Sequence, residues 1–398
     1  MKQSNRLLSL DILRGITVAG MILVNNGWGE SFDMLEHSNW NGMTPCDLVF
    51  PFFLFIMGIS CYLSLVKSEF KPTPQVIRRV IKRTVLLFVI GLFINWFDHA
   101  IEGDFLCFGH LRIWAVLQRI ALCYGIVSLF ALFCNHKYTS PVVIGLLVIY
   151  TAILVFGNGY AEDASINILA QVDLNLFGYD HLYHKSPVDP EGLLGTISSV
   201  AHVLLGFYCG KLIRQKATVS DKVIALFVVG TVLVIGGYLL SYGLPLNKRI
   251  WSPSYVMVTC GLASVLQAFL MYVIDLAGVR SQESGVSRNV QQSSSQQSGV
   301  SRNVQQSSSQ QQTNLLSPDS CLLTPFHVFG VNALALYVSS ELLAIILGNL
   351  GVSELVYNAI HAVIPPLKWA SLVYALYFVG LNFVLGYVLY RKKIYIKL

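Results

Sequence analysis

The chain has 398 residues, of which 54% are hydrophobic and only 12% carry a charged side chain, with a net charge of +6 and a mean hydropathy of +0.60. Soluble domains carry about 25% charged residues, so a soluble enzyme, a secreted domain and a disulfide scaffold are excluded. The eight cysteines lie mostly inside apolar segments and show no CxxC spacing. They are typical of small buried apolar residues rather than of a disulfide or zinc framework.

Ten apolar segments are long enough to cross a bilayer, whose hydrocarbon core requires about 20 helical residues. In chain order they are 8–27, 47–66, 79–97, 112–134, 140–157, 194–213, 222–242, 253–276, 324–348 and 367–390. Backbone polar groups in lipid must be satisfied within the segment, so these spans are predicted to be helices. The sequence therefore predicts an all-α polytopic membrane protein, a bundle of about ten transmembrane helices.

The distribution of Lys and Arg predicts the orientation. With the N-terminus inside, 21 of the 27 basic residues fall in cytoplasmic segments, and the positive-inside rule then places both termini in the cytoplasm. The six basic residues that depart from this pattern are Arg112, Arg119, Lys185, Lys248, Arg249 and Lys368.

The connections divide the chain into three parts. Residues 1–280 form the first eight spans, with long polar outer loops at 28–46 and 158–193, and residues 321–398 form the last two spans of the same domain. Residues 281–320 form a Ser/Gln-rich cytoplasmic loop in which 284–297 recur as 298–311. This composition predicts disorder, and we assign the repeat no role.

Ionisable groups inside the spans need a reason, because each is costly to place in lipid. Asp11 and Arg14 are three residues apart and can pair with each other, and Asp47 can act as a first-turn acid of the second span. Arg112 and Arg119 are seven residues apart in the predicted fourth span. They share roughly one face and suit an anionic group in a polar cavity.

His37 is the most chemically suggestive residue, although a solvated loop histidine is the simpler interpretation. Asp47 follows where the chain re-enters the membrane, and Asn25 lies at the end of the first span. A carboxylate can orient an imidazole and fix its tautomer, while an amide can donate to an oxyanion. These three residues together would form an acyl-transfer site. His181 and His184 have a spacing that suits a metal, but without a clear third ligand we expect no metal site.

Several long motifs carry a family resemblance: SLDILRGITVAGMILVNN, HSNWNGMTPCDLVFPFFLFIMG, RIWAVLQRIALCY, DHLYHKSPVDPEGLLGTISS, PLNKRIWSPSYV, FGVNALALYV and LYRKKIYIKL. Together they resemble the heparan-α-glucosaminide N-acetyltransferase family, in its bacterial N-acetylglucosamine-related branch of the transmembrane acyltransferases. The resemblance covers almost the whole chain except 281–312. The resemblance is to the compact branch, so we expect no counterpart of the lysosomal enzyme's N-terminal lumenal region and first span.

The resemblance implies transfer of an acetyl group from cytoplasmic acetyl-CoA to the amine of a glucosamine-type sugar on the periplasmic side, with no metal. The family's histidine, asparagine and acid map onto His37, Asn25 and Asp47, with His37 as general base or transient acetyl carrier. This chain has Ser340 before Glu341 where the lysosomal enzyme has a histidine, so His37 is expected to act without a second histidine.

The remaining site predictions follow from expected depth in the membrane. The residues expected to contact acetyl-CoA are Arg14, Gln118, Arg119, Asn332 and Tyr337. Those expected to contact the glucosamine-terminated saccharide are Trp40, Asn41, Asp189 and Glu191, although the DPEG segment around the last two can simply cap a helix.

Localisation and partners follow from the same picture. We expect an integral multi-pass protein of the bacterial inner membrane, in contact with the lipid bilayer. We expect no nucleic acid partner, and because symmetric oligomers are common, we expect a homodimer. An amino-sugar transporter and an O-acetyltransferase of a surface glycan remain the alternative functions. Transport finds little support, since we see no inverted repeat and no matching broken helices.

Overall fold

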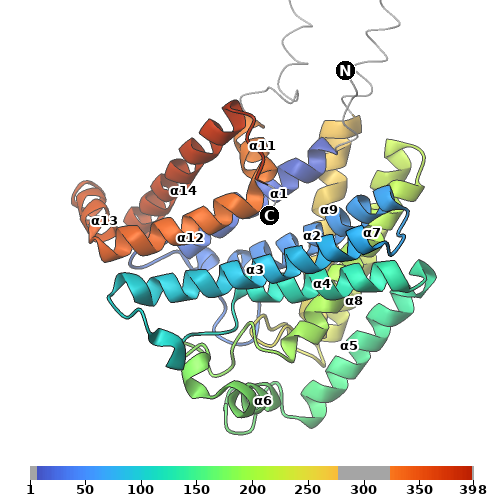
Figure 1. Ribbon diagram of the computed structural model, residues 1–398, viewed down its shortest axis with the longest axis horizontal. Helices are drawn as coiled ribbons and strands as arrows, with labels where there is room; N and C mark the ends of the chain where they lie inside the picture. Colours follow the sequence, from blue (N-terminus) through green and yellow to red (C-terminus); the bar gives the residue numbers. More distant parts are fainter. Residues whose placement is uncertain (1–6, 277–322, 397–398) are drawn as a thin grey trace, which may run out of the picture.

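The computed structural model describes residues 7–276 and 323–396, and all regular elements within these ranges are helical (Figure 1). The predicted disordered segment 281–320 lies outside the described residues. Nine of the described helices are long and apolar enough to cross a membrane, and a bent pair makes ten if it counts as one span. The predicted all-α polytopic class is therefore confirmed.

The nine long helices follow the predicted spans closely. They are α1 (Leu8–Asn25), α2 (Val49–Leu65), α3 (Pro74–Ile101), α4 (Val116–Phe133), α5 (Thr139–Phe156), α7 (Gly195–Gln215), α8 (Val219–Ser241), α9 (Pro253–Leu270) with its π-helical continuation η7 (Met271–Leu276), and α14 (Leu367–Arg391). Shorter helices are η2 (Pro45–Leu48), α6 (Ile168–Phe177), α11 (Thr324–Val331), α12 (Ala333–Asn349) and α13 (Val352–Val363).

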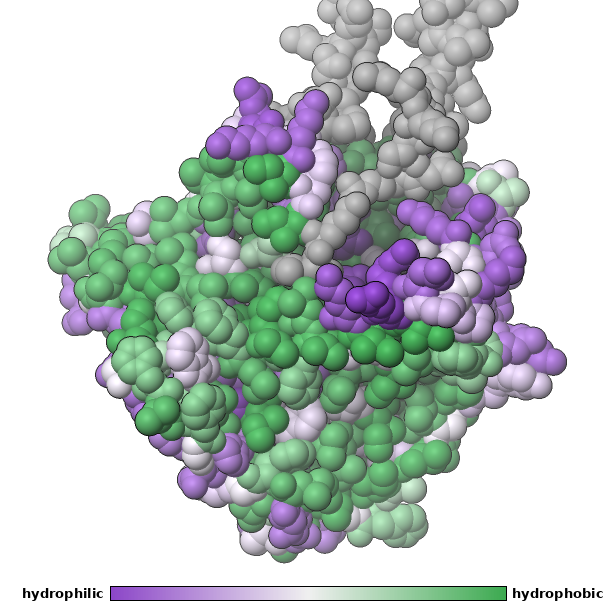
Figure 2. Space-filling view, in the orientation of Figure 1, coloured by the Kyte–Doolittle hydropathy of each residue, from purple (hydrophilic) through white to green (hydrophobic). Residues whose placement is uncertain are grey.

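Burial separates the helices into a central and a peripheral set. More than half of the apolar window is buried in α1, α2, α4, α7 and α9, but less than a third in α3, α5, α8 and α14. On α3, the exposed side chains Ile81, Val85, Val89 and Phe93 recur every four residues and so form one apolar stripe. Such a stripe is expected to face lipid. The space-filling view shows apolar side chains over most of the visible surface (Figure 2).

Two central helices, α2 and α7, approach each other through glycine. A Cβ on Gly58 would collide with the backbone of α7 at Val203, and a Cβ on Gly206 would collide with the backbone of α2 at Phe55. Small residues at a helix contact let two backbones pack closely in a membrane. The α2–α7 contact thus fixes the helix that carries Asp47 at its start.

The predicted ninth span at 324–348 is not one straight helix. It is broken into α11 and α12, which meet at 88°. At the break, Asn332 leaves helical geometry, donates from its amide to the carbonyl of Ile394 and accepts from the backbone NH of Ile396. Side-chain bonding to the C-terminal segment thus replaces continuation of the helix. The apolar pattern could not reveal this break, because hydropathy indicates which residues avoid water and not where the helix axis bends.

Four helix ends that the sequence predicts to be cytoplasmic lie near one another. In Figure 1, the start of α1, the end of the α9–η7 helix, the start of α11 and the end of α14 all lie at the top. α6, from the predicted outer loop 158–193, lies at the bottom. These four helix ends, predicted to be cytoplasmic, therefore lie on the same part of the molecule and away from α6.

Candidate active site

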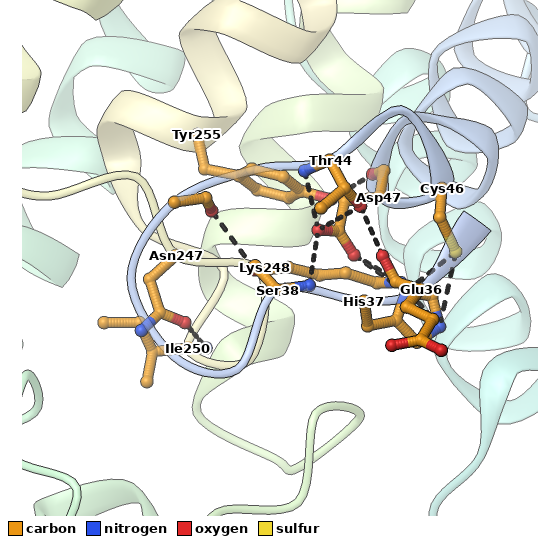
Figure 3. Close-up of polar contacts among 11 residues, drawn as sticks. Glu36, His37, Ser38, Thr44, Cys46, Asp47, Asn247, Lys248, Ile250 and Tyr255 are labelled. Atoms are coloured by element: carbon orange, nitrogen blue, oxygen red, sulfur yellow. Dashed lines mark hydrogen bonds and ion pairs between the residues drawn. The ribbon is translucent and has the colours of Figure 1, made fainter. Parts of the chain in front are cut away.

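The loop before α2 brings His37 against Asp47. The imidazole Nδ1 lies 2.8 Å from Asp47 Oδ1, while Asp47 Oδ2 accepts from the backbone NH of Ser38 and from both the NH and the hydroxyl of Thr44 (Figure 3). The Asp47 side chain is fully buried, whereas 50% of the His37 side chain is exposed. The imidazole is therefore anchored at Nδ1 and free to face solvent at its other edge.

Asp47 thus combines the two roles that the sequence left open. It lies in η2 directly before α2, where a carboxylate interacts favourably with the helix N-terminus. With Thr44, the N-cap residue of η2, it forms a capping box. Pro45 at the first position of η2 has no NH to leave unsatisfied. The same carboxylate holds His37, so the local helix start and the imidazole share one anchor.

Two further side chains touch the imidazole, and neither was among the predicted site residues. Cys46 Sγ lies 3.1 Å from Nδ1, and Lys248 Nζ lies 3.0 Å from Nδ1 and 3.3 Å from Nε2. Lys248 Nζ also lies 3.3 Å from Asp47 Oδ1. One signal could have pointed to Lys248: it is a basic residue in a predicted outer segment, contrary to the positive-inside pattern.

His37 faces a cavity of about 620 Å³ between the helices. The predicted site residues that line this cavity are Asn25, His37, Asp47, Gln118, Glu191 and Tyr337. Glu341, one turn beyond Tyr337 on α12, lines it too and accepts a 3.4 Å bond from the Asn25 amide. The break at Asn332 is what turns α12 so that these two side chains reach the cavity.

Asn25 and His37 line the same cavity, but they do not contact each other. Its amide donates toward Glu341, whereas the hydrogen bonds around His37 come from Asp47, Cys46 and Lys248. The structure therefore brings the predicted histidine and acid into contact and places the predicted amide on the cavity wall.

Gln118 and Arg119 lie side by side at the start of α4 and are almost fully buried. Both polar atoms of the Gln118 amide lack a hydrogen-bond partner among the described residues, and the amide lines the cavity. Arg119 does not line it; it donates to the carbonyl of Gly192 at 2.8 Å and lies over the Trp251 ring. Of these two residues, Gln118 is thus the one with hydrogen-bonding capacity to offer a ligand in the cavity.

The sequence suggested that Arg112 and Arg119 share one helical face, and the structure shows that they do not. α4 begins only at Val116, and Asn95 holds the preceding segment by donating to the Arg112 carbonyl. The Arg112 guanidinium instead forms ion pairs with Asp189 at 3.0 Å and Glu191 at 2.9 Å. Burial opposes the charge on Arg112, but the two carboxylates raise its pKa overall, while burial raises the pKa of Asp189.

The other predicted residues have local partners. Arg14 bonds to Asp11, Ser60 and the carbonyl of Gly330, and Asn332 bonds to the C-terminal segment. Trp40 is buried and donates to the carbonyl of Tyr160, and the Asn41 side chain accepts from Asn247. The structure therefore places these side chains in contacts that join helices and loops around the cavity.

The two histidines considered as metal ligands also have backbone partners. His181 bonds to the carbonyl of Leu111 and His184 to that of Tyr179. Within residues 7–276 and 323–396, no three His, Cys, Asp or Glu side chains are grouped so that they could hold a metal ion. The DPEG segment also caps no helix: α7 begins at Gly195 without a side-chain cap.

Fold and site together define a multi-pass helical membrane protein with a histidine–aspartate pair at a cavity between its helices. The chain matches the family model described as heparan-alpha-glucosaminide N-acetyltransferase, catalytic, over residues 6–242, and it belongs to this family. This confirms the resemblance read from its motifs.

Two curated relatives are similar to this chain. It is 30% identical to the heparan-alpha-glucosaminide N-acetyltransferase of Homo sapiens over 335 residues and 28% identical to that of Mus musculus over 333 residues. Each match covers 69% of this chain and 50% of the relative. The chain thus spans about half the length of the curated relatives it matches.

Proposed function

We propose that this protein is a transmembrane N-acetyltransferase, which moves an acetyl group from cytoplasmic acetyl-CoA to the amine of a glucosamine-type sugar on the periplasmic side. The observation that carries this proposal is the His37–Asp47 pair, anchored by a 2.8 Å contact at the edge of a 620 Å³ cavity. The family and its relatives' names support the reaction type.

The proposed chemistry starts from the imidazole. Because a carboxylate accepts and cannot donate, Nδ1 carries the proton toward Asp47, and Nε2 keeps its lone pair as the base. In direct transfer, the sugar amine attacks the thioester carbonyl and Nε2 takes its proton. In the second route, Nε2 attacks first, forms acetyl-histidine and passes the group outward. Both routes use the same residues.

Acetyl-CoA is proposed to enter from the inner side with its thioester reaching the cavity. Gln118 supports this path, because its buried amide has both a donor and an acceptor to offer the amides of the pantetheine arm. Tyr337 on α12 lines the same space. Basic residues at the inner end of α3 would attract the phosphates; of these, Arg83 lies over the Tyr124 ring, 4.6 Å from its centroid.

The acceptor sugar is proposed to enter from the outer loops. Among the four predicted contacts, Glu191 lines the cavity, and Arg112 holds its carboxylate in place. Trp40, Asn41 and Asp189 support the surrounding loops. Glu191 is therefore the side chain we assign to a sugar hydroxyl or amine.

The test is acetyl transfer in sealed proteoliposomes of known orientation, with labelled acetyl-CoA on one side and glucosamine on the other. We expect His37→Ala to lose at least about 100-fold in rate, the lower end of what a positioned general base contributes. The matched control is His110→Ala, which removes a second histidine–carboxylate pair, with Asp104, at an exposed outer position.

Each outcome has a distinct meaning. Product on the far side from the donor, lost in His37→Ala but kept in His110→Ala, supports the proposal. Glucosamine accumulation without acetyl-CoA indicates a transporter, and product from sugars that lack an amine indicates an O-acetyltransferase. An active His37→Ala protein removes His37 from the mechanism.

A further inference from the structure

The ammonium group of Lys248 lies within hydrogen-bonding distance of both His37, the proposed base, and Asp47. Its Nζ is 3.0 Å from Nδ1 and 3.3 Å from Nε2 of His37, and 3.3 Å from Asp47 Oδ1 (Figure 3). Only 13% of the Lys248 side chain is exposed, and it lines the same cavity as His37.

The loop between α8 and α9 fixes the position of Lys248. The Lys248 carbonyl accepts from the NH of Trp251, while Asn247 exchanges hydrogen bonds with Ser252 and Ile250; all of these partners are buried. Trp251 holds a positive φ of 53°, which a bulky residue adopts only when its surroundings impose it. Lys248 therefore lies on a loop whose conformation is fixed by buried hydrogen bonds, and this loop directs it to the cavity.

Asp47 does not need Lys248 to satisfy its hydrogen-bonding capacity. Its carboxylate already accepts from His37, from the NH of Ser38 and from two donors of Thr44. An ammonium group has three donors and no acceptor. With Nδ1–H directed at Asp47, Nε2 is the ring atom that can accept from Lys248, at the edge of the imidazole that faces the cavity.

We propose that Lys248 is a further catalytic residue, whose ammonium stabilises the negative charge that forms on the thioester carbonyl oxygen during acetyl transfer. This inference rests on the function proposed above. An amine that donates to Nε2 lies about 2.9 Å from it, and the oxygen of the carbonyl it attacks is two bonds further. Nζ lies 3.3 Å from Nε2, so an acetyl group bound on the Lys248 side of the imidazole has its oxygen within hydrogen-bonding reach of Lys248.

The step balances without any other reactant. The amine forms a C–N bond to the carbonyl carbon, the C=O π pair moves to oxygen, and Nε2 takes the amine proton while Lys248 turns a donor to the oxyanion. The oxyanion then re-forms C=O, the C–S bond breaks, and the CoA thiolate leaves and takes the proton back from the imidazolium. Lys248 stays an ammonium throughout.

Asn25 was predicted for this role, but its amide donates toward Glu341. Lys248 is the donor that the structure places next to His37, and its flexible stem allows the ammonium to turn from Nε2 to a substrate oxygen. A cation held beside the reacting carbonyl is well suited to stabilising the developing charge.

The experiment compares Lys248→Met and Lys248→Arg with the wild type in the proteoliposome assay, together with thermal unfolding in detergent. Lys185→Met is the matched control, since Lys185 lines the same cavity from an exposed loop position. We expect Lys248→Met to lose about 100- to 1,000-fold in kcat, the effect of removing one oxyanion donor. KM and the unfolding temperature should stay near wild type, with partial recovery in Lys248→Arg.

The outcomes separate this inference from the proposed function. A wild type that forms no acetylated sugar overturns the proposed function itself. If the wild type is active and Lys248→Met keeps its kcat, Lys248 is not catalytic. A lower unfolding temperature with kcat retained per folded molecule, or an equal loss in Lys185→Met, assigns Lys248 a structural or merely electrostatic role and overturns the inference.

Discussion

Asp47 shows how a single residue can join the fold to the chemistry. Its carboxylate has four donors, of which three come from the segment 38–44 and one from the imidazole of His37. Hydrogen bonds to an ionised group are stronger than those between neutral groups. The orientation of His37 therefore depends on a buried charge that the local backbone was already arranged to hold.

Asp173 on α6 gives a residue-scale prediction about pH. It is buried, and burial raises its pKa from 3.8 to about 6. Its Oδ1 accepts from the NH of Leu193, whereas Oδ2 has no hydrogen-bond partner within the part of the chain that the structure describes. Between these values the unfolded chain is ionised while the native protein keeps its proton. The contribution of Asp173 to stability is thus present below pH 4 and is lost as pH rises to about 6.

We expect Asp173→Asn to remove this loss, which for a shift of two pKa units is on the order of 3 kcal/mol. The unfolding temperature of the variant relative to wild type should be higher at pH 7 than at pH 4.5, as measured by tryptophan fluorescence in detergent. Asp180→Asn, at an exposed site in the same loop, should give no such trend. Equal differences at both pH values would show that Asp173 is not protonated in the native protein.

At the scale of elements, the sequence predicted where the long helices lie, but it did not predict where the chain changes direction. Apolar runs located each long helix, because lipid demands about 20 consecutive apolar residues. The break at Asn332 and the extended segment that carries Arg112 depend on side-chain bonds to distant residues, Ile394 in one case and Asn95 in the other. Such bonds leave no periodic signal in the sequence.

The same limit applies to the site. His37 and Asp47 are ten residues apart, so the sequence could group them in one hypothesis, but it could not show that they meet. Lys248 reaches the imidazole from the loop between α8 and α9, more than 200 residues away. The two loops are joined directly by the bond from the Gly42 NH to the Leu246 carbonyl, and the Tyr255 hydroxyl of α9 holds the Asp47 carbonyl beside them.

The close approach of α2 and α7 predicts the effect of a single methyl group. Gly58→Ala would press a Cβ against the carbonyl of Val203, and overpacking of this kind costs about 1–3 kcal/mol. The control is Gly145→Ala on α5, where the new Cβ meets open space and the helix gains up to about 1 kcal/mol. In a thermal unfolding assay the first should lower the midpoint and the second should not; a stable Gly58→Ala protein would contradict the observed packing.

For the whole molecule, the open prediction is orientation in the bilayer. Cys134, between α4 and α5, is the exposed cysteine among the described residues, and Lys137 beside it is predicted to be cytoplasmic. In a Cys321→Ser background, a maleimide that cannot cross membranes should label Cys134 in inverted vesicles and not in right-side-out vesicles. A Glu162→Cys, Cys134→Ser protein, with its cysteine in the predicted outer loop, should show the reverse. Labelling of Cys134 from the outside would invert the predicted topology.

The double duty of Asp47 has a consequence for anyone who wishes to redesign this protein. A substitution there disturbs the beginning of a central helix and the imidazole at the same time, so variants at 44–47 would combine a folding defect with any effect on the cavity. α12, beyond the break, also lines the cavity, with Tyr337 and Glu341, and these two side chains do not hold the imidazole. Substitutions on α12 can therefore change the shape of the cavity while the contact between Asp47 and His37 stays intact.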